Sequence, residues 1–140
     1  MAAPDLRQGA VFVYPYLWRW QSERGETAGR KERPVCVALP LVRDGMTHLF
    51  LLAITGTLPG ADRIALEIPE IEKRRAGLKE WRRGWVILDE CNYDIAERSF
   101  HFAPDTPSLG RFSEAFTGQI KTAMRAAIAG GALRRIDRAD

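Results

Sequence analysis

The sequence predicts a mainly β protein of the α+β class, in which a small antiparallel barrel carries a short inserted helix and a C-terminal helix. Three observations predict this fold. Apolar segments of strand length follow one another along the chain, short loops separate them, and strands do not alternate regularly with helices as in a doubly wound sheet. With 140 residues, 46% hydrophobic and 28% charged, residues 1–140 are expected to form a single domain.

The first predicted element is an extended segment over residues 11–20, VFVYPYLWRW, which is rich in β-branched and aromatic residues. Every even position is aromatic, from Phe12 to Trp20, so a strand would place five rings on one face. Pro15 cannot donate to a ladder, which puts this strand at an edge or a bulge. We expect the row of rings to form core or an interface, with its second half the more exposed.

A hairpin is predicted next. Residues 22–32 are polar, contain two glycines and have no hydrophobic period, so they are expected to form an exposed loop. Two apolar segments, residues 33–42 and 47–55, flank a turn-like Arg-Asp-Gly sequence at 43–45. We expect the two segments to pair as antiparallel strands.

The chain then alternates between short elements. Residues 63–68 alternate well enough to be a third strand of the sheet. Residues 69–81 predict a short helix, because proline stands in its first turn and acidic residues precede basic ones, as the helix dipole favours. The segment GWVILDE, residues 84–90, predicts another buried strand.

The predicted elements at the C-terminal end are a short strand and a helix. The strand is expected around residues 98–102, before a stretch rich in proline and glycine. Apolar residues then recur at helical spacing from Phe112 to Ile128, and Gly130-Gly131 follows them. A C-terminal helix that ends at these glycines is therefore expected.

Several kinds of functional site are missing from the sequence. It has no phosphate-binding GxxxxGK or GxGxxG loop and no GxSxG nucleophile elbow. His48 and His101 stand alone in strand-like segments, and Cys36 and Cys91 match no CxxC pattern. We therefore expect no metal site, no cofactor and no disulfide, with both cysteines buried as reduced thiols.

The charge is compatible with a nucleic-acid partner without requiring one. The net charge is only +3, but 17 of the 21 basic residues are arginine, whose planar group grips phosphate or carboxylate with two hydrogen bonds. The longest apolar run, residues 49–54, is far shorter than the roughly 20 residues that span a bilayer, and the first residues carry no apolar signal segment. The sequence predicts a cytoplasmic protein with no membrane partner.

Arg33 and Thr55 are the candidate catalytic residues. Counting outward from the turn places them opposite each other, where the second predicted strand begins and the third ends. A guanidinium and a hydroxyl side by side can hold the oxygens of a phosphate, and the cation can stabilise charge that develops there. The spacing leaves the alternative open that they form a strand-end ion pair and an ordinary strand threonine.

The order of the segments resembles the PemK/MazF family of toxin endoribonucleases along nearly the whole chain. The segments are VFVYPY after a glycine, GETAGRKERPVCVAL, LLAITGT, WVILDECNYDI and LGRFSEAF. Arg33-Pro34 and Thr55 occupy the places of the family's active-site arginine and hydroxyl residue, and Glu26 that of an acidic loop residue. Asp89-Glu90 stands where the family usually has Asp-Gln, and Ile87 where some members have a second catalytic arginine.

The resemblance implies an SH3-like barrel, usually a homodimer, that cleaves single-stranded RNA without a metal and is inhibited by an antitoxin protein. Cleavage would proceed by attack of the RNA's own 2′-hydroxyl on the adjacent phosphate. Arg33 would be the cation on that phosphate and Thr55 would orient it, while the proton acceptor stays open.

The residues expected to contact RNA surround this pair. They are Glu26, Arg30 and Lys31 in the polar loop, and Tyr16 and Trp18, whose rings could stack on bases. The alternative function is a non-catalytic SH3-like barrel that binds RNA or a protein partner.

Overall fold

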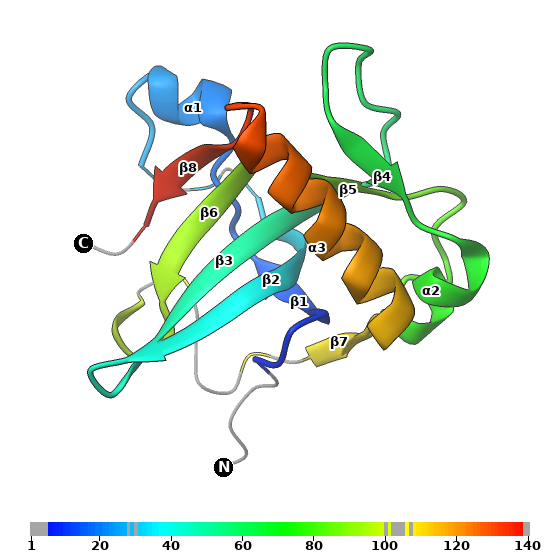
Figure 1. Cartoon of the computed structure of the whole chain (residues 1–140), viewed down its shortest axis with the longest axis horizontal. Helices are drawn as coiled ribbons and strands as arrows, with labels where there is room; N and C mark the ends of the chain where they lie inside the picture. Colours follow the sequence, from blue (N-terminus) through cyan, green and yellow to red (C-terminus); the bar gives the residue numbers. More distant parts are fainter. Residues whose placement is uncertain are drawn as a thin grey trace.

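The computed structural model describes residues 6–27, 29, 31–99, 101, 106 and 108–138 (Figure 1). Within these residues the strands are β1 (Ala10–Tyr14), β2 (Arg33–Arg43), β3 (Met46–Thr55), β4 (Ala65–Glu67), β5 (Trp85–Ile87), β6 (Glu90–Ile95), β7 (Ser108–Arg111) and β8 (Arg134–Asp137). The α-helices are α1 (Arg19–Glu23), α2 (Glu70–Arg75) and α3 (Glu114–Ala129), and a 3₁₀ turn spans Ala96–Arg98.

All eight strands belong to one sheet, which confirms the mainly β, antiparallel prediction. The order is β4-β5-β3-β2-β1-β7, while β6 pairs with β3 and the short β8 runs parallel to β6. β3 changes partner along its length: residues 48–51 pair with β6, and Ile54 and Thr55 pair with β5. Among the described residues no ladder joins β7 back to β4 or to β8, so the fold is an eight-stranded sheet in which closure into a barrel is not shown.

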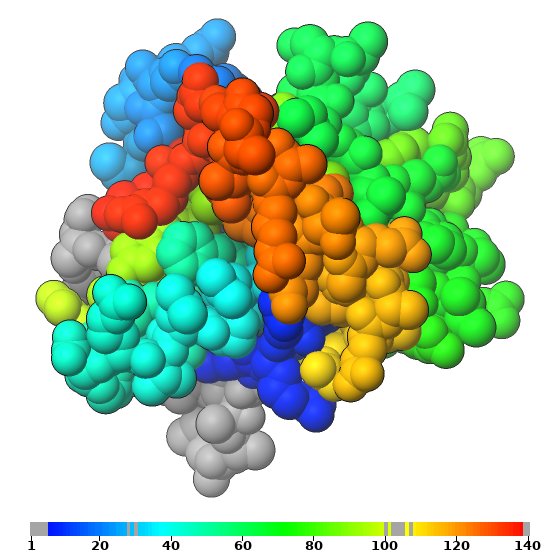
Figure 2. Space-filling view, in the orientation of Figure 1, coloured from blue at the N-terminus to red at the C-terminus, as the bar shows by residue number. Residues whose placement is uncertain are grey.

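Two apolar clusters pack on the two faces of this sheet. One lies under α3 and includes Leu52, Ile54 and Phe116, and the other includes Phe12, Tyr14 and Leu51. Figure 1 shows α3 crossing in front of β2 and β3, and Figure 2 shows the same helix filling the surface between the β2–β3 hairpin and the region of α2. One face of the sheet thus packs against α3, and on the other face side chains of β1, β2 and β3 pack against one another.

The C-terminal helix forms as its apolar spacing predicts. Ser113 caps it, because its hydroxyl oxygen accepts a hydrogen bond from the Phe116 N–H at 3.1 Å. The buried carboxylate of Glu72 in α2 accepts hydrogen bonds from the Ser113 N–H and hydroxyl, at 2.9 and 2.7 Å. The helix ends at Gly130, and Gly131 has the positive φ of 70° that glycine tolerates.

The extended segment predicted over residues 11–20 is wrong beyond Tyr14. Pro15 has no N–H to donate, and the Tyr16 N–H bonds back to the Tyr14 carbonyl at 2.8 Å, so the ladder stops and the chain turns into α1. The five rings therefore do not share one face. Tyr16 is 1% exposed, whereas Trp20, in α1, is 41% exposed.

Other element boundaries also differ from the prediction. The strand expected over residues 84–90 forms only as β5, and β6, which begins at residue 90 and pairs with the other half of β3, was not predicted. The strand expected around 98–102 overlaps the 3₁₀ turn and then leaves the described residues. The short strands β7 and β8 were not predicted, because four-residue strands carry little periodicity.

The remaining sequence expectations concern cysteines, metals and membranes. Cys36 and Cys91 are free and buried, which confirms the prediction of reduced thiols. In the part of the chain that the structure describes, no group of three or more His, Cys, Asp or Glu side chains is arranged to hold a metal ion. None of the described helices has the length and apolar character to cross a bilayer.

Candidate nucleic-acid interface

A pocket of about 290 Å³ lies beside the start of β2. The described residues that line it are Tyr16, Trp18, Trp20, Gln21, Lys31 and Arg33. Four of the seven residues selected from the sequence thus line one cavity, and this lining combines three aromatic rings with two cations. The described lining contains no carboxylate, so the pocket favours an anionic ligand that also carries a flat ring.

Arg33 is held in place by its strand and by Trp18. It faces Tyr14 in the β1–β2 ladder, and its guanidinium carbon lies 4.9 Å from the centroid of the Trp18 ring. Burial lowers the pKa of Arg33 below its ordinary value, although arginine stays a cation at neutral pH. The Arg33 Nε is buried and has no hydrogen-bond partner among the described residues.

Thr55 does not join this pocket. The predicted hairpin register holds at Val35 and Ala53, the last residues that pair between β2 and β3. The described β2–β3 ladder ends there: Arg33 pairs with Tyr14 of β1, and Thr55 pairs with Trp85 of β5. The Thr55 hydroxyl oxygen accepts a hydrogen bond from the Thr57 N–H at 3.1 Å, and Thr55 is not among the described lining residues.

The loop residues selected from the sequence have different positions. Lys31 is exposed and lines the pocket. Glu26 is half-buried, and its N–H donates to the Gln21 carbonyl at 3.0 Å, but it is not part of the described lining. Arg30 lies outside the described residues.

Helix α1 supplies the part of the pocket that the sequence did not predict. The Trp18 N–H donates to the Gln21 side-chain oxygen at 3.0 Å, which starts the helix. The rings of Tyr16 and Trp18 meet edge to face with centroids 5.0 Å apart. Trp20 and Gln21 follow on the helix, so the N-cap and the first turn of α1 together present two indoles and an amide to the same cavity.

A row of buried polar residues on β6 holds this aromatic segment, and sequence reasoning did not select it. The row consists of Glu90, Asn92 and Asp94, which alternate along the strand. The Asp94 carboxylate accepts from the Tyr14 hydroxyl at 2.7 Å, and the Asn92 side chain accepts from the Leu17 N–H at 2.9 Å and donates to the Leu17 carbonyl at 2.8 Å. The signal was present in the sequence, since polar residues occupy every second position of ECNYDI.

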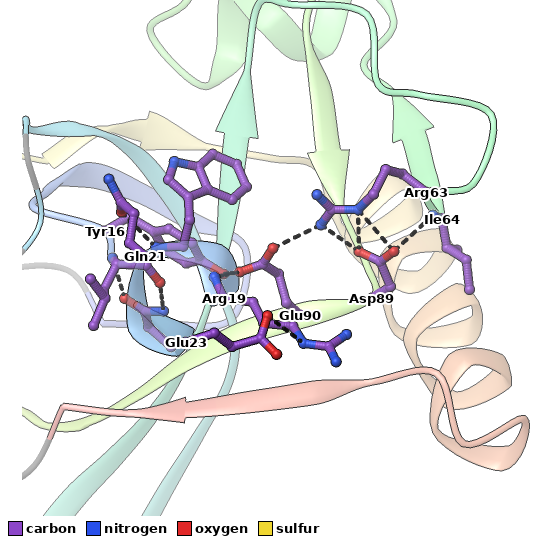
Figure 3. Close-up of polar contacts among 11 residues, drawn as sticks. Tyr16, Arg19, Gln21, Glu23, Arg63, Ile64, Asp89 and Glu90 are labelled. Atoms are coloured by element: carbon purple, nitrogen blue, oxygen red, sulfur yellow. Dashed lines mark hydrogen bonds and ion pairs between the residues drawn. The ribbon is translucent and has the colours of Figure 1, made fainter. Parts of the chain in front are cut away.

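A second pocket, of about 230 Å³, adjoins the first at Trp20 and contains an arginine between two carboxylates. Arg63 makes a two-pronged contact with Asp89, through Nε and Nη2, and its Nη2 also donates to Glu90 at 2.8 Å (Figure 3). Burial acts to raise the pKa of Asp89, but the hydrogen bonds from Arg63 and from the Ile64 N–H, together with the charge of Arg63, outweigh it and the pKa is lowered. Burial raises the pKa of Glu90.

Replacing Asp89 with asparagine is expected to lower the free energy of unfolding by about 2 kcal/mol near pH 7, because it removes a charged partner from Arg63. The folded-state pKa of Asp89 lies below its ordinary value, so this stabilisation is present above the ordinary pKa and is lost as the pH falls through the folded pKa. Urea denaturation at about pH 7 and about pH 3 measures the difference. An equal difference at both pH values would contradict the ion pair.

Comparison with protein-family models, with curated proteins and with solved structures finds no match to this chain. Function is therefore inferred from the chemistry of the site together with the order of motifs in the sequence.

Proposed function

We propose that this protein binds single-stranded RNA at the Arg33 pocket and cleaves it without a metal ion, as a toxin-like endoribonuclease. The observation that carries the proposal is the composition of the pocket, in which the cations Arg33 and Lys31 face the rings of Tyr16, Trp18 and Trp20. Proteins bind single strands through cations on the phosphates and aromatic rings that stack on bases. The order of motifs along the chain supplies the link to RNA cleavage.

The reaction would use the substrate's own nucleophile. The 2′-oxygen attacks the adjacent phosphorus, the bond to the 5′-oxygen breaks, and the products are a 2′,3′-cyclic phosphate and a 5′-hydroxyl. The negative charge on the phosphate oxygens grows in the transition state, and the Arg33 guanidinium, which lines the pocket, would stabilise it. Thr55 would take part only if bound RNA reaches from the pocket to the end of β3.

A second candidate function, the binding of RNA without cleavage, is favoured by a specific observation. Cleavage needs a group that accepts the 2′-hydroxyl proton, and the described lining contains neither a carboxylate nor an imidazole. Homodimer formation and an antitoxin partner stay predictions of the resemblance, as does a cytoplasmic location.

The test is an RNA assay in the presence of a chelator. The purified protein is expected to cut a labelled single-stranded RNA in excess EDTA and to leave a 2′,3′-cyclic phosphate on the upstream fragment. A DNA strand of the same sequence is the control, because it keeps the bases and phosphates but lacks the 2′-hydroxyl, and it should stay intact. RNA that is bound but uncut would select the second candidate, and failure to bind any strand would exclude both.

A further inference from the structure

We infer that Glu90 is a positioning residue of the RNA site: its buried carboxylate holds the aromatic wall of the pocket against Arg33. The wall is defined here as Tyr16, Trp18 and Trp20. The inference rests on the proposed RNA site for its binding readout, but the position of Trp18 can be measured without RNA.

Glu90 joins three separate segments of the chain. Its carboxylate is 4% exposed and accepts hydrogen bonds from the Tyr16 hydroxyl at 3.2 Å, the Arg19 N–H at 2.9 Å and Arg63 Nη2 at 2.8 Å. Figure 3 shows the carboxylate between the start of α1 and Arg63. Asp89 fixes Arg63 in turn, so the Glu90 carboxylate that accepts from Arg63 is itself held in one orientation.

The wall depends on these side-chain bonds because it has little backbone pairing. β1 ends at Tyr14, and no ladder between the described strands contains residues 15–18. Trp18 stands between Tyr16 and Arg19, both of which bond to Glu90, and Leu17 is fixed by Asn92. The ring of Trp18 is the one that stacks on the Arg33 guanidinium, so the position of the wall decides whether the ring and the cation meet.

The two oxygens of the Glu90 carboxylate accept hydrogen bonds from different partners, so a conservative variant can be distinguished from a disruptive one. Oε2 accepts from Tyr16 and from Arg19, and Oε1 accepts from Arg63. Glutamine can keep an oxygen at the position of Oε2, where it still accepts from Tyr16 and Arg19, and so preserve the wall. Leucine has a similar size but no acceptor, and it would leave the Tyr16 hydroxyl and the Arg19 N–H unpaired.

The experiment compares Glu90→Leu with Glu90→Gln and with a matched control, Glu72→Leu. Glu72 is also buried and accepts three hydrogen bonds, from Ser113 and Arg75, but it lies on α2 and does not line the pocket. Binding of a fluorescein-labelled single-stranded RNA is measured under conditions where each variant is folded. Glu90→Leu is expected to weaken binding about tenfold, while Glu90→Gln and Glu72→Leu stay within about threefold of the parent.

The second readout is the indole N–H signal of Trp18 in a ¹H–¹⁵N spectrum without RNA. Glu90→Leu should shift it, and Glu90→Gln and Glu72→Leu should not. Tyr16→Phe, which removes only the hydroxyl, should shift the Trp18 signal in the same direction. This variant tests the inference even if Glu90→Leu does not fold. An unchanged Trp18 signal in Tyr16→Phe and Glu90→Leu, or equal loss of binding in Glu72→Leu, would overturn the inference. If the Trp18 signal shifts in these variants but the parent protein binds no RNA, the positioning role is upheld and the proposed function is rejected.

Discussion

Replacing Arg33 with alanine is expected to lower the rate of RNA cleavage by about 10²- to 10³-fold, which is the usual loss when a preorganised donor to a developing oxyanion is removed. The guanidinium lines the pocket and the Trp18 ring stacks on it, which would hold the cation beside a bound phosphate. Single-turnover cleavage of a labelled RNA at saturating protein measures the effect separately from binding.

Two further variants serve as controls for that measurement. Arg33→Lys keeps the positive charge but loses the planar fork, so its rate should lie between those of the parent and Arg33→Ala. Thr55→Ala tests the residue that the sequence paired with Arg33 and that lies outside the described lining. An unchanged rate in Arg33→Ala, with the variant folded, would contradict the role of Arg33 in cleavage.

Replacing Phe116 with alanine is expected to lower the free energy of unfolding by about 3–5 kcal/mol. Phe116 is 2% exposed in the cluster beneath α3, and its ring meets that of Phe112 edge to face at 4.9 Å. Truncation leaves a cavity between the helix and the sheet, where the surrounding strands cannot close in. Equilibrium denaturation in urea, followed by far-ultraviolet circular dichroism, measures the loss.

The matched control is Gln119→Ala, on the exposed face of the same helix. It keeps the helix and leaves the core untouched, so its free energy of unfolding should stay within about 0.5 kcal/mol of the parent value. A loss below about 1 kcal/mol in Phe116→Ala would mean that α3 is not anchored through this ring.

The elements with a strong period were predictable from the sequence. The β2–β3 hairpin follows from two apolar runs about a turn, and α3 follows from an apolar stripe that ends at glycines. Of the candidate site, the sequence correctly grouped Tyr16, Trp18, Lys31 and Arg33, because aromatic and basic residues close to one strand start reach a common space.

The rest depended on tertiary contacts that no local pattern encodes. Thr55 was paired with Arg33 by counting residues, but the described β2–β3 ladder ends at Val35 and Ala53, and Thr55 pairs with Trp85 of β5. Helix α1 is five residues long, too short for a period, and is held by β6 side chains about 70 residues away in sequence. Glu90 therefore looked like part of a short motif, whereas its role comes from the three segments that it joins.

The described β2–β3 ladder ends at Val35 and Ala53, and Arg33 begins β2 beyond it, paired with β1. The position of the cation is thus set by strand pairing, while Trp18 and Trp20 belong to a connection outside the ladders of the described residues. Under the proposed function, a change in this connection would alter which nucleotides the rings contact without moving the cation.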